Sequence, residues 1–213
     1  MQFCPVNNKI ILYNHEWCSD SGIRRMWLWD GERHIRLRSE DKNRSRKDWT
    51  CHEMWSEDGK YIIYHGIYKN GIAYVGRINM DGSKNSIEIP FRSDYRDYGH
   101  FSVGPNGLLV SNEYYQEDED FVNSNILEDK TKKLNWSNRD NDTISNENGR
   151  WISIVKANWD NRDTDWIPLC KHDSNWDSQD SHPHPIINHS GTAVYFNSNR
   201  DGNLVIYKVD IEK

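Results

Sequence analysis

Residues 57–64 read Glu-Asp-Gly-Lys-Tyr-Ile-Ile-Tyr, a turn dipeptide followed at once by a run of β-branched and aromatic side chains. Asp-Gly or Asn-Gly ahead of such a run is a β-hairpin signal. Similar turn-plus-strand units occur at residues 5–13, 105–110, 147–154 and 189–196. Four turn glycines follow one another at intervals of 48, 42 and 42 residues, at positions 59, 107, 149 and 191. Short strands that repeat every 40–50 residues or so are typical of a β-propeller.

The repeat therefore predicts an all-β fold. We expect a β-propeller of about five four-stranded blades, or a partial or open propeller, in which residues 1–213 form a single domain. The unit at 147–154 is the least regular of the five. No segment has the apolar periodicity of an amphipathic helix.

Composition narrows the possible partners. The formal net charge of −6 argues against binding to a phosphate backbone, so we expect no nucleic-acid partner. No apolar run approaches the ~18 residues of a membrane span, and the N-terminus lacks a signal-peptide pattern. We expect no membrane partner and a soluble, cytoplasmic protein; the sequence leaves the oligomeric state open. Four scattered cysteines are predicted to be small buried hydrophobes, namely Cys4, Cys18, Cys51 and Cys170.

Three histidines share one position in the repeat. His52, His100 and His184 each precede the turn glycine of their unit by seven residues. We therefore expect each at the same place on the innermost strand of its blade, facing the central channel. Each ring taken alone could be a hydrogen-bonded packing residue. The shared register favours a metal or catalytic site assembled from several blades.

A second histidine pattern points to the same chemistry. Residues 179–185 read Gln-Asp-Ser-His-Pro-His-Pro. The prolines bias His182 and His184 toward extended backbone, and residues two apart in an extended chain point to the same side. Gln179 can add an amide oxygen. Two imidazoles and an amide oxygen together predict a divalent-metal site beside a cavity or axis.

These motifs resemble a known family. Leu-Cys-Lys-His at 169–172, Gln-x-x-His-Pro-His at 179–184 and Ser-Asn-Arg-Asp-Gly at 198–202 resemble the C-terminal part of oligogalacturonate lyases, polysaccharide lyases with a seven-bladed β-propeller. Weaker similarity includes Arg-Met-Trp at 25–27 and His-Glu-x-Trp at 52–55. The chain is shorter than members of that family, so it corresponds either to a fragment or to an open or smaller propeller.

The resemblance implies roles for individual residues. A divalent ion, most simply Mn²⁺, would be held by His100, Gln179, His182 and His184. His52 would be the catalytic base, and Arg25 would assist near the substrate carboxylate. Further substrate contacts are expected from Arg24, His15 and His172.

The implied reaction is β-elimination in oligogalacturonides, acidic oligosaccharides from pectin, to give 4,5-unsaturated uronates. A base removes the proton at C5, and a cation spreads the charge that develops on the neighbouring carboxylate. Two alternatives stay open. Residues 56–64 also resemble the repeats of TolB-like propellers, which suggests a non-catalytic binding module or an inactive relative. A metal-dependent glycan hydrolase would need a carboxylic acid, with Glu16, Glu53 and Glu113 as candidates.

Overall fold

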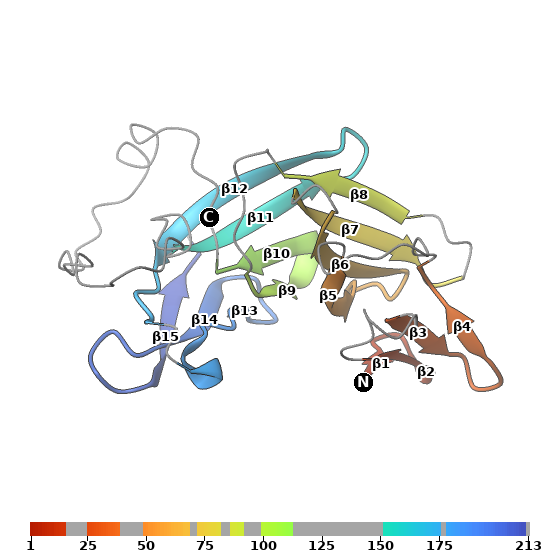
Figure 1. Ribbon diagram of the computed structural model, residues 1–213, viewed down its shortest axis with the longest axis horizontal. Helices are drawn as coiled ribbons and strands as arrows, with labels where there is room; N and C mark the ends of the chain where they lie inside the picture. Colours follow the sequence, from red (N-terminus) through yellow and green to blue (C-terminus); the bar gives the residue numbers. More distant parts are fainter. Residues whose placement is uncertain are drawn as a thin grey trace. The chain divides into compact units, whose positions relative to one another are not determined.

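The computed structural model describes residues 1–15, 25–38, 49–68, 72–81, 86–91, 99–112, 151–175 and 178–211. Their regular structure consists of β-strands and two single-turn 3₁₀ helices (Figure 1). Within these ranges no helix has the length and apolar character needed to cross a membrane. The chain divides into two compact units, of which the first contains residues 1–96 and 157–164 and the second contains residues 97–156 and 165–213.

The first unit contains two four-stranded sheets, each with its strands in chain order. One sheet consists of β1 (Gln2–Cys4), β2 (Asn7–Asn14), β3 (Met26–Trp29) and β4 (His34–Arg36). The other consists of β5 (Trp49–Trp55), β6 (Tyr61–Ile67), β7 (Ala73–Asn79) and β8 (Ser86–Pro90). All the neighbouring strands in both sheets are antiparallel. This up-and-down order is that of a propeller blade.

Two further sheets begin in the second unit. One consists of β9 (Phe101–Val103), β10 (Leu108–Ser111), β11 (Trp151–Asn158) and β12 (Asp163–Lys171), with the 3₁₀ helix η1 (Pro105–Gly107) between β9 and β10. The last follows the 3₁₀ helix η3 (Gln179–Ser181) and consists of β13 (Ile186–Ile187), β14 (Ala193–Ser198) and β15 (Val205–Asp210). Residues 157–164, which comprise the end of β11, the hairpin loop and the start of β12, are grouped with the first unit.

The all-β propeller prediction is confirmed, with four sheets in the described residues instead of five blades. The difference lies in the unit at 147–154. Its strand, β11, pairs antiparallel with β10, so that Val110 lies opposite Ile154. This strand is the third of its sheet and does not begin a new one. The sequence between β10 and β11 is long enough to match the spacing of the repeat. The strand after it therefore looks, in the sequence, like the start of another blade. The single-domain organisation stays a prediction.

The repeated turn is conformationally the same in three sheets. Gly59, Gly107 and Gly191 have φ angles of 67°, 72° and 67°. Only glycine adopts this left-handed conformation without a steric penalty from a Cβ atom. The dipeptides that predicted the hairpins therefore predicted their backbone as well.

Each unit has its own apolar core. In the first unit most core side chains come from β2, β3, β6 and β7, and they include Leu12, Leu28, Ile62, Tyr64, Tyr74 and Ile78. In the second unit they come from β10, β11 and β14 and include Val110, Ile152, Ile154, Val194 and Phe196. Burial alternates along β3, as expected from the two-residue period of β structure, whereas β7 and β11 are buried over four and five consecutive residues.

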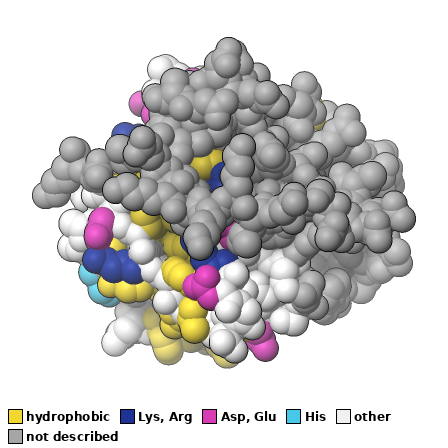
Figure 2. All heavy atoms as spheres, turned by 90° about the vertical axis from the view of Figure 1, so that its left-hand side faces the viewer, with side chains coloured by type: hydrophobic (Ala, Val, Ile, Leu, Met, Phe, Trp, Pro, Cys, Tyr) yellow, Lys and Arg dark blue, Asp and Glu magenta, His cyan; other side chains and the backbone are white. Residues whose placement is uncertain are grey.

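The edge strand β15 carries apolar side chains that are not covered. Ile206 is 72% exposed and Val205 is 44% exposed. Figure 2 looks onto the left-hand side of Figure 1, where β15 lies, and shows hydrophobic side chains at the surface beside basic and acidic ones.

A close contact between β6 and β7 gives a first prediction. Gly76 lies opposite Tyr64, whose buried hydroxyl donates a hydrogen bond of 2.9 Å to Glu88. A Cβ atom at position 76 would lie 2.4 Å from Cζ of this ring. Gly76→Ala should therefore lower the free energy of unfolding by about 1–3 kcal/mol, measured by urea denaturation. The same substitution should cost much less in a Tyr64→Leu background; an equal cost in both backgrounds would show that the ring is not responsible.

Candidate functional site

Three histidines of the second unit converge. His100 lies directly before β9, His182 follows η3, and His184 lies shortly before β13. Nε2 of His100 is 3.0 Å from Nδ1 of His182, and the ring centroids of His100 and His184 are 3.9 Å apart. One nitrogen from each ring can be chosen so that all three lie within 4.8 Å of one another. Three imidazoles far apart in the sequence are therefore close enough to hold a single metal ion.

Backbone hydrogen bonds position the His-Pro-His segment. The carbonyl of Pro183 accepts a 2.7 Å bond from the N–H of Asn197 on β14. The carbonyl of Pro185 accepts a 2.6 Å bond from the hydroxyl of Ser102 on β9. The segment is thus fixed to two strands through its main chain.

The two histidines of this segment differ in backbone conformation. His182 is extended as predicted, with φ −66° and ψ 139°. His184 is not extended, because its φ is 42°. We expected both rings to face the same side because both residues would be extended. This reason is wrong for His184, although both rings lie close to His100. A non-glycine residue in the left-handed region costs roughly 1–3 kcal/mol and is most common at functional sites.

Gln179 begins η3, the turn that leads into His182. Its carbonyl accepts a 3.3 Å hydrogen bond from the N–H of His182, and its side chain is exposed. The turn is capped reciprocally by Ser178 and Ser181. Gln179 thus helps to place His182 through its backbone, and a role for its amide oxygen as a metal ligand stays a prediction.

The electrostatics at His182 favour a neutral ring. Burial lowers the pKa of His182 from its ordinary value of 6.5, and the neighbouring His184 lowers it further. A neutral imidazole has a lone pair to offer to a cation, whereas an imidazolium has none.

This shift makes stability without metal depend on pH. Because the folded state lowers the pKa of His182, the unfolded state binds more protons just below pH 6.5. The contribution of this group is therefore complete above pH 6.5 and decreases as the pH falls toward the folded-state pKa. We expect an NMR titration to give His182 a midpoint below 6.5, and His182→Asn to remove this part of the pH dependence. A midpoint at or above 6.5 would contradict the argument.

His52 belongs to a different group of side chains, in the first unit. It lies on β5, is half-buried, and has its Nδ1 atom 2.6 Å from Nε2 of His65 on β6. Nδ1 of His52 is also 3.5 Å from Sγ of Cys51. Cys51 is buried as predicted, but it contacts two imidazoles rather than a purely apolar environment. The base role of His52 stays a prediction.

Arg25 is engaged with an internal carboxylate. Directly before β3, it contacts both carboxylate oxygens of Glu53, with Nε on Oε1 and with Nη2 3.1 Å from Oε2. Asn14 donates a further 2.9 Å hydrogen bond to Oε2. Glu53 is only 1% exposed, so it is not positioned to contact a glycan as a general acid. The structure thus assigns Arg25 a structural partner, and its role toward a substrate stays a prediction.

The predicted substrate contacts lie in dissimilar surroundings. His15 is exposed and packs edge-to-face against Tyr13 and Trp27, with centroid distances of 5.8 and 6.1 Å. His172 is fully buried, and its Nδ1 accepts a 3.0 Å hydrogen bond from the N–H of Ser174. The ring has no exposed surface and supports the local loop, and a substrate contact by His172 stays a prediction. Three further candidates lie outside the described residues, namely Arg24, Glu16 and Glu113.

Comparison with known proteins gives structural matches only. No protein-family model and no curated protein matches the chain. An oligogalacturonate lyase from Vibrio parahaemolyticus is similar in structure, with a TM-score of 0.63 and 20% identity over 96% of this chain and 46% of that one. A second oligogalacturonate lyase, in complex with manganese, has a TM-score of 0.63 and 17% identity over 99% of this chain and 47% of that one.

A different propeller protein is also similar. TolB from Acinetobacter baumannii has a TM-score of 0.51 and 17% identity over 96% of this chain and 39% of that one. The chain therefore spans less than half the length of each of these three proteins. At this identity the likeness extends to architecture, and the chain has the β-propeller fold that the lyases and TolB share.

Proposed function

We propose that this chain is an oligogalacturonate lyase-like protein that binds a divalent ion of the manganese type and takes part in β-elimination of acidic oligosaccharides. The observation that carries the proposal is the convergence of His100, His182 and His184. The likeness of the chain's fold to two oligogalacturonate lyases, one of them in complex with manganese, adds support. The cytoplasmic location expected from the sequence is part of the same proposal.

The donor set fits such an ion. Three imidazole nitrogens suit Mn²⁺, and also Zn²⁺, Ni²⁺ or Co²⁺, and the amide of Gln179 would be a compatible fourth donor. When bound, the ion would act as a Lewis acid toward a uronate carboxylate, because neutral ligands leave its charge intact. The chain has a net charge of −6, and a bound cation would provide local attraction for an acidic sugar.

The remaining chemistry needs a proton acceptor. We assign the role of proton acceptor to the imidazole of His52, because an imidazole can act as a base close to neutral pH. This assignment comes from the sequence resemblance.

The test is an elimination assay on oligogalacturonides. We expect ultraviolet absorbance from an unsaturated product to increase in the presence of Mn²⁺ and to stop when a chelator is added. Circular dichroism establishes first that the protein is folded. A folded, metal-loaded protein that yields saturated products would be a hydrolase. One that yields no product would not be a lyase.

A non-catalytic binding propeller is the second candidate. It is favoured by the likeness to TolB and by the engagement of Arg25 with Glu53, which uses a predicted catalytic residue structurally. For this candidate we expect oligogalacturonide binding, measured by calorimetry, without turnover.

A further inference from the structure

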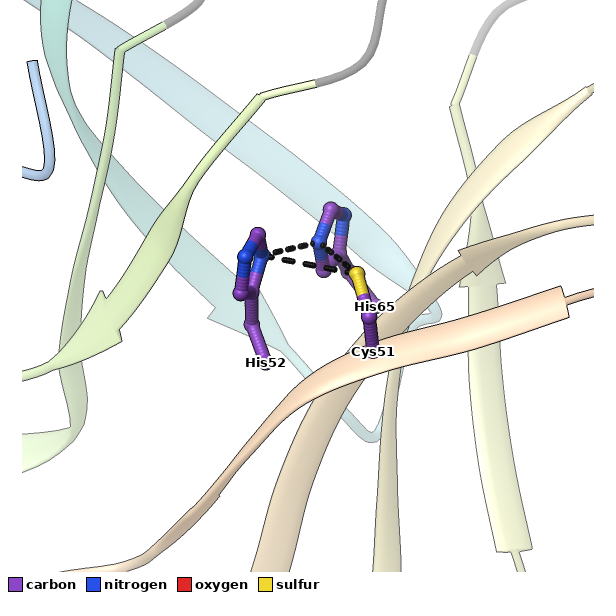
Figure 3. Close-up of side chains that lie close together, drawn as sticks. All are labelled: Cys51, His52 and His65. Atoms are coloured by element: carbon purple, nitrogen blue, oxygen red, sulfur yellow. Dashed lines mark hydrogen bonds between the residues drawn. The ribbon is translucent and has the colours of Figure 1, made fainter. Parts of the chain in front are cut away.

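A second set of potential metal ligands lies in the first unit, on β5 and β6. Sγ of Cys51 is 2.9 Å from Nε2 of His65, which is itself 2.6 Å from Nδ1 of His52. The rings of His52 and His65 are stacked, with centroids 4.7 Å apart and planes inclined by 6°. Figure 3 shows the thiol and the two rings pointing toward one another. We call these three residues the thiolate cluster.

The backbone brings these side chains together through an irregularity. Cys51 and His65 lie directly opposite each other in the β5–β6 ladder. In a regular strand the next residue, His52, would point to the opposite face. The register shifts between Cys51 and Met54, and His52 has a φ of 51°, so the bulge directs its ring to the same side as the thiol. A strained non-glycine residue within a strand is a reason to look for a function.

The three contacts converge on the same few atoms. A neutral imidazole has one N–H and one lone pair, so the short contact between His52 and His65 uses a single shared proton. The sulfur of Cys51 contacts the same nitrogen of His65, so this one atom takes part in two short contacts. A cation at the centre would engage a lone pair from all three atoms at once.

We propose that Sγ of Cys51, Nδ1 of His52 and Nε2 of His65 bind a zinc-class metal ion, at a site separate from the all-imidazole cluster. A thiolate with two imidazoles is a ligand set for Zn²⁺ rather than for Mn²⁺. Three protein ligands leave the fourth tetrahedral position open.

The geometry requires only a small adjustment. Metal–nitrogen bonds of ~2.0–2.1 Å place two tetrahedral nitrogen ligands about 3.3 Å apart. The observed separation of 2.6 Å is shorter, so the rings must open by less than about 1 Å. The Sγ–Nε2 separation of 2.9 Å between Cys51 and His65 is likewise shorter than the ~3.6 Å expected for a sulfur and a nitrogen on one tetrahedral zinc ion, so these two atoms must also separate by less than about 1 Å.

Metal binding here excludes the base role of His52. Coordination through Nδ1 leaves the proton of the ring on Nε2, so the ring has no lone pair with which to accept another. Elimination that works through His52 therefore requires an empty thiolate cluster. The two ideas are tested by different readouts, because metal ligation by sulfur is visible without any substrate.

The experiment is cobalt substitution of the folded, metal-free protein. Co²⁺ bound by a thiolate gives a charge-transfer band in the near ultraviolet, which imidazole ligation does not give. We expect this band in the wild type and its loss in Cys51→Ser, with zinc affinity reduced at least ~100-fold, above the range typical of outer-shell partners. Cys170→Ser is the matched cysteine control and should keep the band. The double variant His182→Ala/His184→Ala should keep it as well.

Two results would overturn the proposal: a folded wild type without the band, or a band that survives in Cys51→Ser. If Cys51→Ser does not fold, a zinc titration of the wild type decides. At neutral pH, binding should release about one proton per ion because a coordinated thiol is deprotonated. Zinc binding without proton release would also count against it. Absence of an unsaturated product would refute only the lyase proposal and would leave the band unchanged.

Discussion

His182→Ala should lower the affinity for Mn²⁺ by at least ~100-fold, equivalent to about 2.7 kcal/mol of binding free energy. Nδ1 of this ring lies 3.0 Å from Nε2 of His100, and the ring is one of the three imidazoles that converge among the described residues. Calorimetric titration with Mn²⁺ measures the affinity directly. If the lyase proposal holds, formation of unsaturated product should decrease in parallel, because fewer molecules carry the ion.

His189→Ala is the matched control for this variant. His189 is exposed in the turn between β13 and β14, so its removal should leave Mn²⁺ affinity unchanged. Equal affinity in His182→Ala and wild type would mean that manganese binds elsewhere. A comparable loss in both variants would mean that the effect is not specific to the cluster.

Arg25→Met should lower the free energy of unfolding by about 3–5 kcal/mol, because it leaves the buried carboxylate of Glu53 without its cationic partner. Urea denaturation gives the change. Replacing both partners, in Arg25→Met/Glu53→Met, should recover much of the loss, since an apolar pair carries no unpaired charge.

The exposed ion pair of Arg33 with Asp30 provides the comparison. Arg33→Met should change stability little, because a solvated side chain that is 76% exposed loses only a screened interaction. If Arg25→Met unfolds at the same urea concentration as the wild type, the ion pair is not structural. Arg25 would then be available for the substrate role that the resemblance implies.

The local turn signals in the sequence predicted the fold well. Asp-Gly or Asn-Gly before a β-rich run encodes a left-handed glycine, and Gly59 and Gly107 have that conformation. The same signal at residues 148–149 predicted a blade too many. Strand pairing decides which sheet a strand joins, and the pairing of β11 with β10 is a long-range contact that a local pattern does not contain.

The shared repeat position of the histidines identified equivalent residues, but not their backbone conformation. His52 and His184 occupy the same place in the repeat, and both have positive φ angles, of 51° and 42°. Counting positions located the equivalent residues, but it did not reveal the conformation that directs their rings.

The thiolate cluster was not predicted from the sequence, because its third member, His65, lies on a different strand from Cys51 and His52. Ser56 and Tyr61 close the β5–β6 turn with a 2.9 Å hydrogen bond. Counting outward from them would have placed His65 opposite His52 and next to Cys51. The pairing of Arg25 with Glu53 had no such signal, because it joins two different sheets.

The convergence of His100, His182 and His184 on one cation is tested most directly by crystals grown with Mn²⁺, with data collected at the manganese absorption edge. We predict one anomalous peak within coordination distance of a nitrogen from each of the three rings. Well-ordered imidazoles with no peak between them, at a manganese concentration that saturates the protein in solution, would contradict this assignment.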